Sequence, residues 1–138
     1  MGRVTDRLLQ AMNAHDIDAF VACVAPDYRS EQPAHPSRAF HGSAQVRENW
    51  TSVFAGVPDF TAELLASATS DDGVEIGEWR WHGTHVDGSP FAMRGVTVFG
   101  IEREQIVWGR LYMENVDDDG AGIDAAVLEM YRPPPAAD

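Results

Sequence analysis

The sequence predicts a single α+β domain in which helices come first and an antiparallel sheet follows. Apolar residues recur at helical spacing over residues 4–57, whereas residues 60–116 tend to alternate between apolar and polar side chains. Turn sequences divide that second part into segments of strand length. Helices followed by a run of strands, within 138 residues, fit one α+β domain.

Three helices are expected before Pro58, which ends the last of them. The first runs from Val4 to Met12, where apolar residues are spaced by four. The second follows with Asp16 as its N-cap and Pro26 as its stop. The strongest helical pattern covers residues 43–57, with Ser43 as the expected cap.

Extended segments make up most of the remaining chain. A short one is expected at YRSEQPA, and four longer strands are expected at 60–70, 74–85, 91–102 and 105–116, with turns at 71–73, 87–90 and 103–104. The domain is expected to span residues 1–117. Residues 118–138 are expected to form a C-terminal extension with one short helix and a disordered, proline-rich tail.

Helices on one side of a sheet imply a curved sheet, and whatever the helices leave unfilled becomes a pocket. The segment EWRWHGTH indicates which strand face lies there. Trp79 and Trp81 alternate with Glu78, Arg80 and His82, as in a strand with unlike faces. We expect the tryptophans to face the helices, where they border either a cavity or a solid core.

The hairpin with its turn at 103–104 predicts a register for the last two strands. Val98 would face Gly109, Val96 would face Leu111, and Arg94 would face Met113. Trp79 would then lie near Val96, and Trp81 near Arg94. The expected inward face comprises Val96, Val98, Leu111 and Met113, and the expected outer face comprises Thr97, Phe99, Trp108, Arg110, Tyr112 and Glu114. Aromatic and charged side chains together on one face are typical of a subunit interface, so we predict a homodimer through the outer face.

Composition excludes several classes of partner. The formal net charge is -12, and the ten basic residues are all arginine and scattered along the chain, so neither nucleic acid nor an anionic membrane is an expected partner. The lone Cys23 cannot form an intrachain disulfide and is expected to be a small buried hydrophobe. Without a signal peptide or a membrane span in the sequence, a cytoplasmic location is expected.

Four segments resemble the SnoaL-like polyketide cyclases. They are MNAHDIDAFVACVAPDY, FHGSAQVRENW, WRWHGTHVDG and QIVWGRLYMENV, within residues 5–117. These cyclases belong to the nuclear-transport-factor-2-like superfamily, together with ketosteroid isomerase and limonene epoxide hydrolase. The resemblance implies a cone-shaped barrel in which a bent sheet wraps around three helices, with a deep apolar pocket and commonly a dimer.

The resemblance also places the catalytic positions of the relatives on this chain. The base of ketosteroid isomerase would fall at Gln32, and its oxyanion-hole acid at Val96. The aspartate of limonene epoxide hydrolase would fall at Leu111. The inward positions that match the His and Asp of SnoaL-like cyclases are apolar here, and Glu114 is the nearest acid.

Five polar residues remain as catalytic candidates. Glu31 would turn inward with a one-residue register shift and could serve as a general base; otherwise it is a surface carboxylate. Gln32 could orient a substrate carbonyl or a water. His35 and His41 lie in a loop near the expected mouth, and either could carry a proton. Arg94 could stack on Trp81 and hold an anionic substrate group, or form a salt bridge at the rim.

The expected lining of the pocket is aromatic and aliphatic. It comprises Tyr28, Trp50, Phe54, Trp79, Trp81, Val96, Leu111 and Met113. The histidines match no established metal-binding spacing, so no metal or cofactor is expected.

Three functions are compatible with these features. The first is a cofactor-free cyclase, isomerase or hydratase acting on a hydrophobic, polyketide-like molecule. The second is a non-catalytic protein that binds such a molecule. The third is a dimerisation scaffold with a filled core.

Overall fold

The computed structural model describes residues 3–131, and the expected disordered tail at 132–138 lies outside them. The helices are α1 (Val4–Ala14), α2 (Ile17–Ala22), the 3₁₀ turn η1 (Pro36–Arg38), α3 (Ser43–Gly56) and α4 (Ile123–Met130). The strands are β1 (Val24–Glu31), β2 (Phe40–His41), β3 (Thr61–Thr69), β4 (Glu75–Thr84), β5 (Pro90–Glu102) and β6 (Gln105–Asn115).

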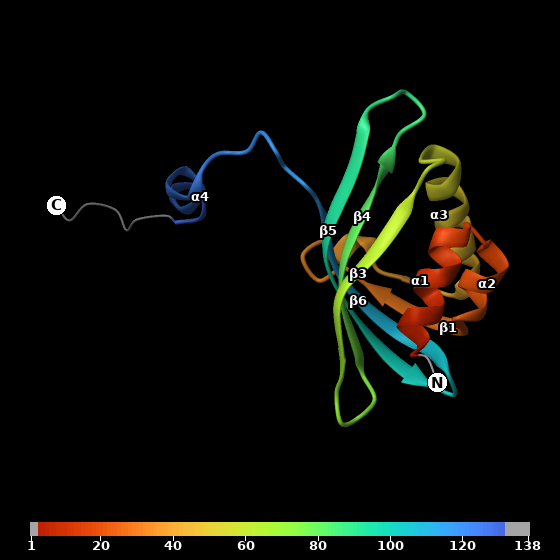
Figure 1. Ribbon diagram of the computed structural model, residues 1–138. Helices are drawn as coiled ribbons and strands as arrows, with labels where there is room; N and C mark the ends of the chain where they lie inside the picture. Colours follow the sequence, from red (N-terminus) through yellow and green to blue (C-terminus); the bar gives the residue numbers. More distant parts are fainter. Residues whose placement is uncertain (1–2, 132–138) are drawn as a thin grey trace.

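The six strands form one curved sheet in the order β2-β1-β6-β5-β4-β3. Neighbouring strands are antiparallel except β1 and β6, which are parallel. Helices α1, α2 and α3 gather on one side of this sheet (Figure 1). The predicted α+β class, with helices on one face of a bent, mostly antiparallel sheet, is confirmed.

Polar side chains hold both ends of α1 against the sheet. The carboxylate of Glu75 at the start of β4 accepts hydrogen bonds from the backbone N–H groups of Val4 (3.2 Å) and Thr5 (2.7 Å). It also accepts one from the Thr5 hydroxyl at 2.7 Å. Near the other end of α1, the Asn13 amide exchanges two hydrogen bonds with the backbone of Ala62 in β3. These hydrogen bonds join the start of α1 to β4 and its C-terminal part to β3.

The boundaries of α2 and β1 partly differ from those predicted. Asp16 is the N-cap of α2, since its carboxylate accepts from the backbone N–H of Ala19 at 3.0 Å, as expected. The helix ends at Ala22, however, and Pro26 lies in β1. The β1–β6 register is irregular between Val24 and Arg29, so a residue without an N–H is tolerated there.

The start of α3 also differs from the prediction by one residue. Gly42 is the N-cap, with a φ of 96°, and Ser43 is the first helical residue, without a side-chain capping bond. A φ in this range favours glycine, so the chain turns sharply from β2 into the helix.

The one lone cysteine is buried, as expected. Cys23 is 4% exposed and follows α2 directly. Burial raises the pKa of its thiol, and the Arg7 guanidinium offsets part of that increase. A thiol in this setting is a packing residue rather than a nucleophile.

A β-bulge corrects the predicted register of β5 against β6. The turn lies at 103–104 as expected, because Glu102 pairs with Gln105. Gly100 pairs with Trp108 but Ile101 pairs with Ile106, so Val107 is an extra residue on β6. Because of this extra residue, each residue of β5 before the bulge pairs one position further along β6 than predicted. A shift of one residue exchanges the two faces of a strand.

The bulge reverses the predicted faces of β5 and leaves those of β6 unchanged. Val96, Val98 and Arg94 were expected to face inward, and instead lie on the outer face, while Thr97 and Phe99 are buried under the helices. Leu111 and Met113 face inward, as predicted. Trp79 pairs with Gly95, and Trp81 with Met93, so neither expected neighbour on β5 was right, although both indoles face inward.

The outer face carries cross-strand ion pairs. Glu63 lies 3.0 Å from Arg80 and 3.3 Å from His82. Arg94 lies on the outer face, 3.5 Å from Glu78, so its predicted stacking on Trp81 is wrong and it forms an ion pair instead. These side chains are about half exposed, so the pairs add little to stability.

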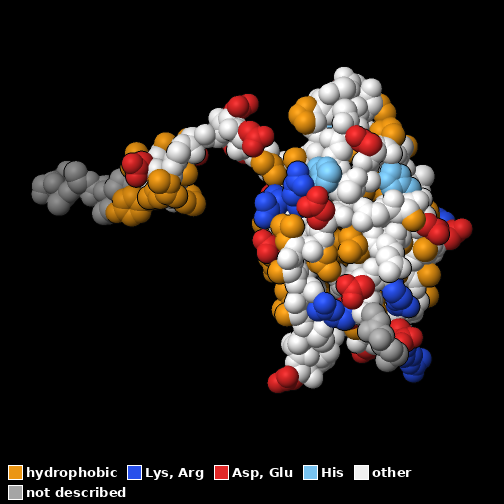
Figure 2. Space-filling model, viewed as in Figure 1, with side chains coloured by type: hydrophobic (Ala, Val, Ile, Leu, Met, Phe, Trp, Pro, Cys, Tyr) orange, Lys and Arg blue, Asp and Glu red, His pale blue; other side chains and the backbone are white. Residues whose placement is uncertain are grey.

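Helix α4 stands clear of the sheet and of the other helices (Figure 1). Its apolar side chains are exposed, among them Ile123 (75%), Leu128 (71%) and Met130 (76%). They appear as an orange group away from the body in Figure 2. None of the helices within residues 3–131 combines the length and apolar character needed to cross a membrane.

Candidate functional site

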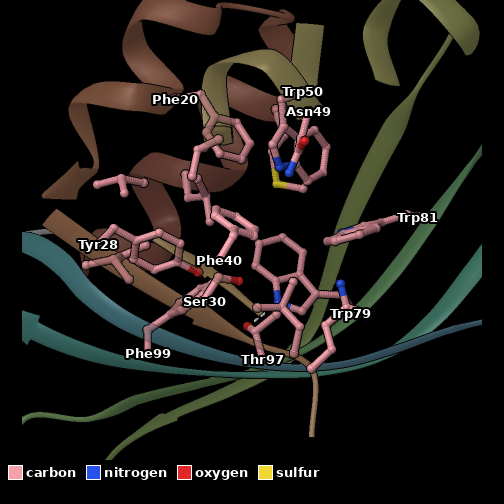
Figure 3. Close-up of a pocket in the computed structure, with 17 residues that line it drawn as sticks. Phe20, Tyr28, Ser30, Phe40, Asn49, Trp50, Trp79, Trp81, Thr97 and Phe99 are labelled. Atoms are coloured by element: carbon pink, nitrogen blue, oxygen red, sulfur yellow. Dashed lines mark hydrogen bonds between the residues drawn. The ribbon is translucent and has the colours of Figure 1, made fainter. Parts of the chain in front are cut away.

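A cavity of about 190 Å³ lies between the concave face of the sheet and helices α1–α3. Figure 3 shows its lining. Twelve of the side chains are aliphatic or aromatic: Leu8, Met12, Phe20, Val24, Phe40, Val46, Trp50, Trp79, Trp81, Phe99, Ile106 and Leu111. Five carry polar groups: Tyr28, Ser30, Gln32, Asn49 and Thr97.

The two tryptophans of β4 form part of the sheet side of the cavity. Trp79 is fully buried, and its indole N–H donates a hydrogen bond of 2.8 Å to the Thr97 hydroxyl on β5. The bulge makes this bond possible, because it turns Thr97 inward beside the indole. Trp81 is 7% exposed, and its Nε1 is buried without a hydrogen-bond partner among residues 3–131.

Aromatic packing joins the helices to this side of the cavity. The Trp50 ring on α3 meets Trp81 edge to face, with 5.3 Å between the ring centroids. Its centroid lies 4.7 Å from that of Phe20 on α2. All three of these rings line the cavity. Phe54, which was expected to line it, instead stacks on His15 at 4.5 Å and is not among the lining residues.

Strand β1 and the residue directly after it supply three polar groups by simple alternation. Tyr28, Ser30 and Gln32 are two residues apart, so their side chains point to the same face. Burial raises the pKa of the Tyr28 phenol, and a hydrogen bond with Ser30 offsets part of that rise. The two hydroxyls lie close together in Figure 3. Tyr28 packs directly over Gly109, where a side chain would collide with its hydroxyl.

Two amides complete the polar lining, and each is held by a neighbour. The Arg38 guanidinium of η1 donates a hydrogen bond of 3.0 Å to Oε1 of Gln32. On α3, Oδ1 of Asn49 accepts a hydrogen bond of 2.7 Å from Nε2 of Gln45. The amide nitrogens of both side chains therefore remain without a hydrogen-bond partner among residues 3–131.

No Asp, Glu, His, Lys or Arg is present among the lining residues in the described part of the chain. Glu31 is exposed on β1 opposite Arg110, so the register shift that would turn it inward does not occur. His35 lies outside the lining, with its Nε2 2.7 Å from a carboxylate oxygen of Glu114. His41 is exposed on β2. Of the catalytic candidates, only Gln32 reaches the cavity.

The expected lining is partly observed. Tyr28, Trp50, Trp79, Trp81 and Leu111 line the cavity. Met113 is buried but lies outside the lining, and Val96 lies on the outer face. Within residues 3–131, no three or more His, Cys, Asp or Glu side chains are grouped so that they could hold a metal ion.

The family model of the SnoaL-like domain matches residues 5–108, which is most of the chain. The chain belongs to the SnoaL-like family. The predicted resemblance is therefore confirmed. A comparison with curated protein sequences gave no match.

Solved structures with low sequence identity share the fold of this SnoaL-like protein. A proposed polyketide cyclase from Streptomyces antibioticus superposes with a TM-score of 0.70 at 20% identity, over 80% of this chain and 89% of that chain. A proposed isomerase from Bacillus subtilis gives 0.71 at 16% identity, over 80% and 84%. A Mycobacterium tuberculosis protein in complex with estradiol-17β-hemisuccinate gives 0.68 at 18% identity, over 79% and 89%.

Sequence reasoning missed several lining residues of this SnoaL-like chain. Ser30 follows from the alternation of β1, a signal that could have identified it beside Tyr28. Thr97 and Phe99 could not be assigned correctly without the bulge at Val107. Asn49 lies next to the predicted Trp50, but helical spacing alone did not place it toward the sheet.

Proposed function

We propose that this SnoaL-like protein binds an uncharged, largely apolar ring compound in the cavity between the sheet and α1–α3. One observation carries the proposal: among residues 3–131 the cavity lining holds twelve apolar and five neutral polar side chains, and no side chain that is charged at neutral pH. A charged ligand group would lose its hydration there without gaining a counter-ion, whereas an apolar ring gains by leaving water.

The shape and chemistry of the lining favour flat rings. Trp50, Trp79 and Trp81 present three indole rings to one cavity. Aromatic side chains pack well against flat ring systems, by offset stacking or edge-to-face contact. The mycobacterial neighbour in complex with a steroid ester is one example of this fold with a ring compound bound. We therefore propose a small, polyketide-like ring compound as the ligand class, since a cavity of about 190 Å³ is below the roughly 300 Å³ at which sites for drug-sized ligands begin.

A second candidate function is catalysis without a charged base. The Tyr28 hydroxyl is the one titratable group that the described lining offers, and it could donate a hydrogen bond to a carbonyl oxygen that gains negative charge. The cavity could also hold a flexible substrate in a folded conformation. The general-base roles considered for Glu31, His35 and His41 have no support in this geometry.

Ligand binding can be tested by tryptophan fluorescence, because three of the four tryptophans line the cavity. We would titrate the protein with a panel of uncharged bicyclic to tetracyclic compounds. Leu111→Phe adds volume inside the cavity and is expected to raise the dissociation constant of the best ligand by about tenfold or more. Leu65→Phe is the matched control, because Leu65 is 45% exposed on β3.

The proposal predicts saturable quenching by at least one compound, lost in Leu111→Phe and retained in Leu65→Phe. Quenching that is equal in both variants would place the ligand elsewhere. The absence of saturable quenching by any compound would favour a filled scaffold over a binding protein.

We further propose that the outer face of the sheet forms a homodimer interface. Tyr112 is 42% exposed and Ile76 is 38% exposed on this face. Arg110 covers the Trp108 ring at 4.5 Å. Exposed aromatic and aliphatic side chains with arginine among them are the composition of subunit interfaces.

A further inference from the structure

We infer that the cavity selects ligands whose polar groups are hydrogen-bond acceptors only, such as ketones, quinones and esters, over ligands that carry O–H or N–H donors. The inference rests on the proposed function and concerns the chemistry of the same cavity. The observation behind it is that several lining oxygens already accept hydrogen bonds from the protein itself.

Two polar lining side chains, Gln32 and Thr97, each contact a group that can only donate a hydrogen bond. A guanidinium has no acceptor, so the contact between Arg38 and Gln32 at 3.0 Å must use the amide oxygen of Gln32. An indole N–H also only donates, so Trp79 at 2.8 Å must use the hydroxyl oxygen of Thr97. In both cases the protein itself already uses one of the two lone pairs of the lining oxygen.

The polar lining atoms that have no partner within the protein are mostly hydrogen-bond donors. The amide nitrogen of Gln32 has no acceptor among residues 3–131, and the buried Nε1 of Trp81 has none either. Asn49 follows the same pattern, since its oxygen accepts from Gln45 and its N–H₂ is left. The Tyr28 hydroxyl faces the Ser30 hydroxyl, and each of these two groups can donate as well as accept.

The lining also lacks the strongest acceptor found in proteins. No carboxylate lines the cavity in the described part of the chain, so a ligand O–H or N–H would meet few free oxygens. A buried donor left without an acceptor is costly, whereas a ligand carbonyl can accept from two lining donors at once. The cavity is therefore suited to carbonyl or ether oxygens on an apolar skeleton.

A matched set of bicyclic probes separates this inference from the proposed function. 1-Indanone carries an acceptor, indane carries no polar group, and indole carries a donor, and all three have nearly the same shape. We would measure their dissociation constants by NMR titration of the full chain. We expect 1-indanone to bind about tenfold more tightly than indane, and indole to bind no better than indane.

A substitution in the cavity provides the second arm. Gln32→Glu keeps the shape but replaces the amide donor with an acceptor, so we expect the advantage of 1-indanone over indole to fall about tenfold. His41→Ala is the control, because His41 is an exposed residue outside the lining, and it should leave all three constants unchanged. If Gln32→Glu does not fold, the order of the three probes on the unaltered protein still decides the question.

The outcomes are distinct. Indole binding as tightly as 1-indanone would overturn the donor-rich account while leaving an apolar ring-binding cavity in place. No binding of any of the three probes, together with none in the fluorescence panel, would overturn the proposed function and this inference with it.

Discussion

Replacing Glu75 with alanine is predicted to destabilise the protein through the helix that covers the cavity. The Glu75 carboxylate is 6% exposed and accepts three hydrogen bonds from the first turn of α1, at 3.2, 2.7 and 2.7 Å. At about 1 kcal/mol for each bond, the loss in free energy of unfolding is about 3 kcal/mol. Helix α1 also carries Leu8 and Met12 of the cavity lining, so ligand binding should weaken as well.

Thermal and urea unfolding would measure this effect. A loss of about 3 kcal/mol corresponds to a fall of roughly 10 °C in Tm for a domain of this size. Glu78→Ala is the matched control, because Glu78 lies on the same strand but is half exposed and only pairs with Arg94 at 3.5 Å. We expect the control to lose under about 0.5 kcal/mol. Equal losses in the two variants would refute the role assigned to Glu75.

Three further predictions concern the cavity and the outer face. Gly109→Ala should push the Tyr28 hydroxyl out of place and weaken 1-indanone binding by about tenfold, whereas unchanged binding would show that this hydroxyl does not contact the ligand. Because burial raises the pKa of Tyr28 in the folded protein, the native state keeps a proton that the unfolded chain loses, so stability should fall as pH rises above about 10. Denaturant titrations should show a shallower alkaline decline for Tyr28→Phe, and identical declines would contradict the assignment. Tyr112→Asp on the outer face should convert a dimer to monomers in sedimentation experiments, and a dimer of unchanged affinity would exclude this interface.

The order of the elements was predictable because it depends on local patterns. Helical spacing, the Asp16 cap and the turn at 103–104 are each set by neighbouring residues. Strict alternation likewise placed Trp79 and Trp81 on the concave face. These signals need no knowledge of distant parts of the chain, and they identify the sheet and the helices that enclose the cavity.

The faces of β5 were not predictable from the same patterns. Val96 and Val98 are more apolar than Thr97, so side-chain character pointed to the wrong face. The bulge at Val107 inserts one residue and turns Thr97 inward, where the buried indole of Trp79 gives its hydroxyl a partner. Pairing between distant residues decided this point. The catalytic roles predicted for Glu31 and Arg94 failed for the same reason. The register of the neighbouring strands decides which way each side chain points, and it places both outside the cavity.

The dissociation constant of 1-indanone as a function of pH tests the central claim most directly. If the cavity holds no group that changes charge, binding of this neutral ligand should vary by less than about twofold between pH 5 and 9. A change of tenfold with a midpoint in the range of a carboxyl or imidazole group would mean that an ionisable side chain reaches the ligand. That result would contradict the uncharged cavity and return the acid–base enzyme to first place.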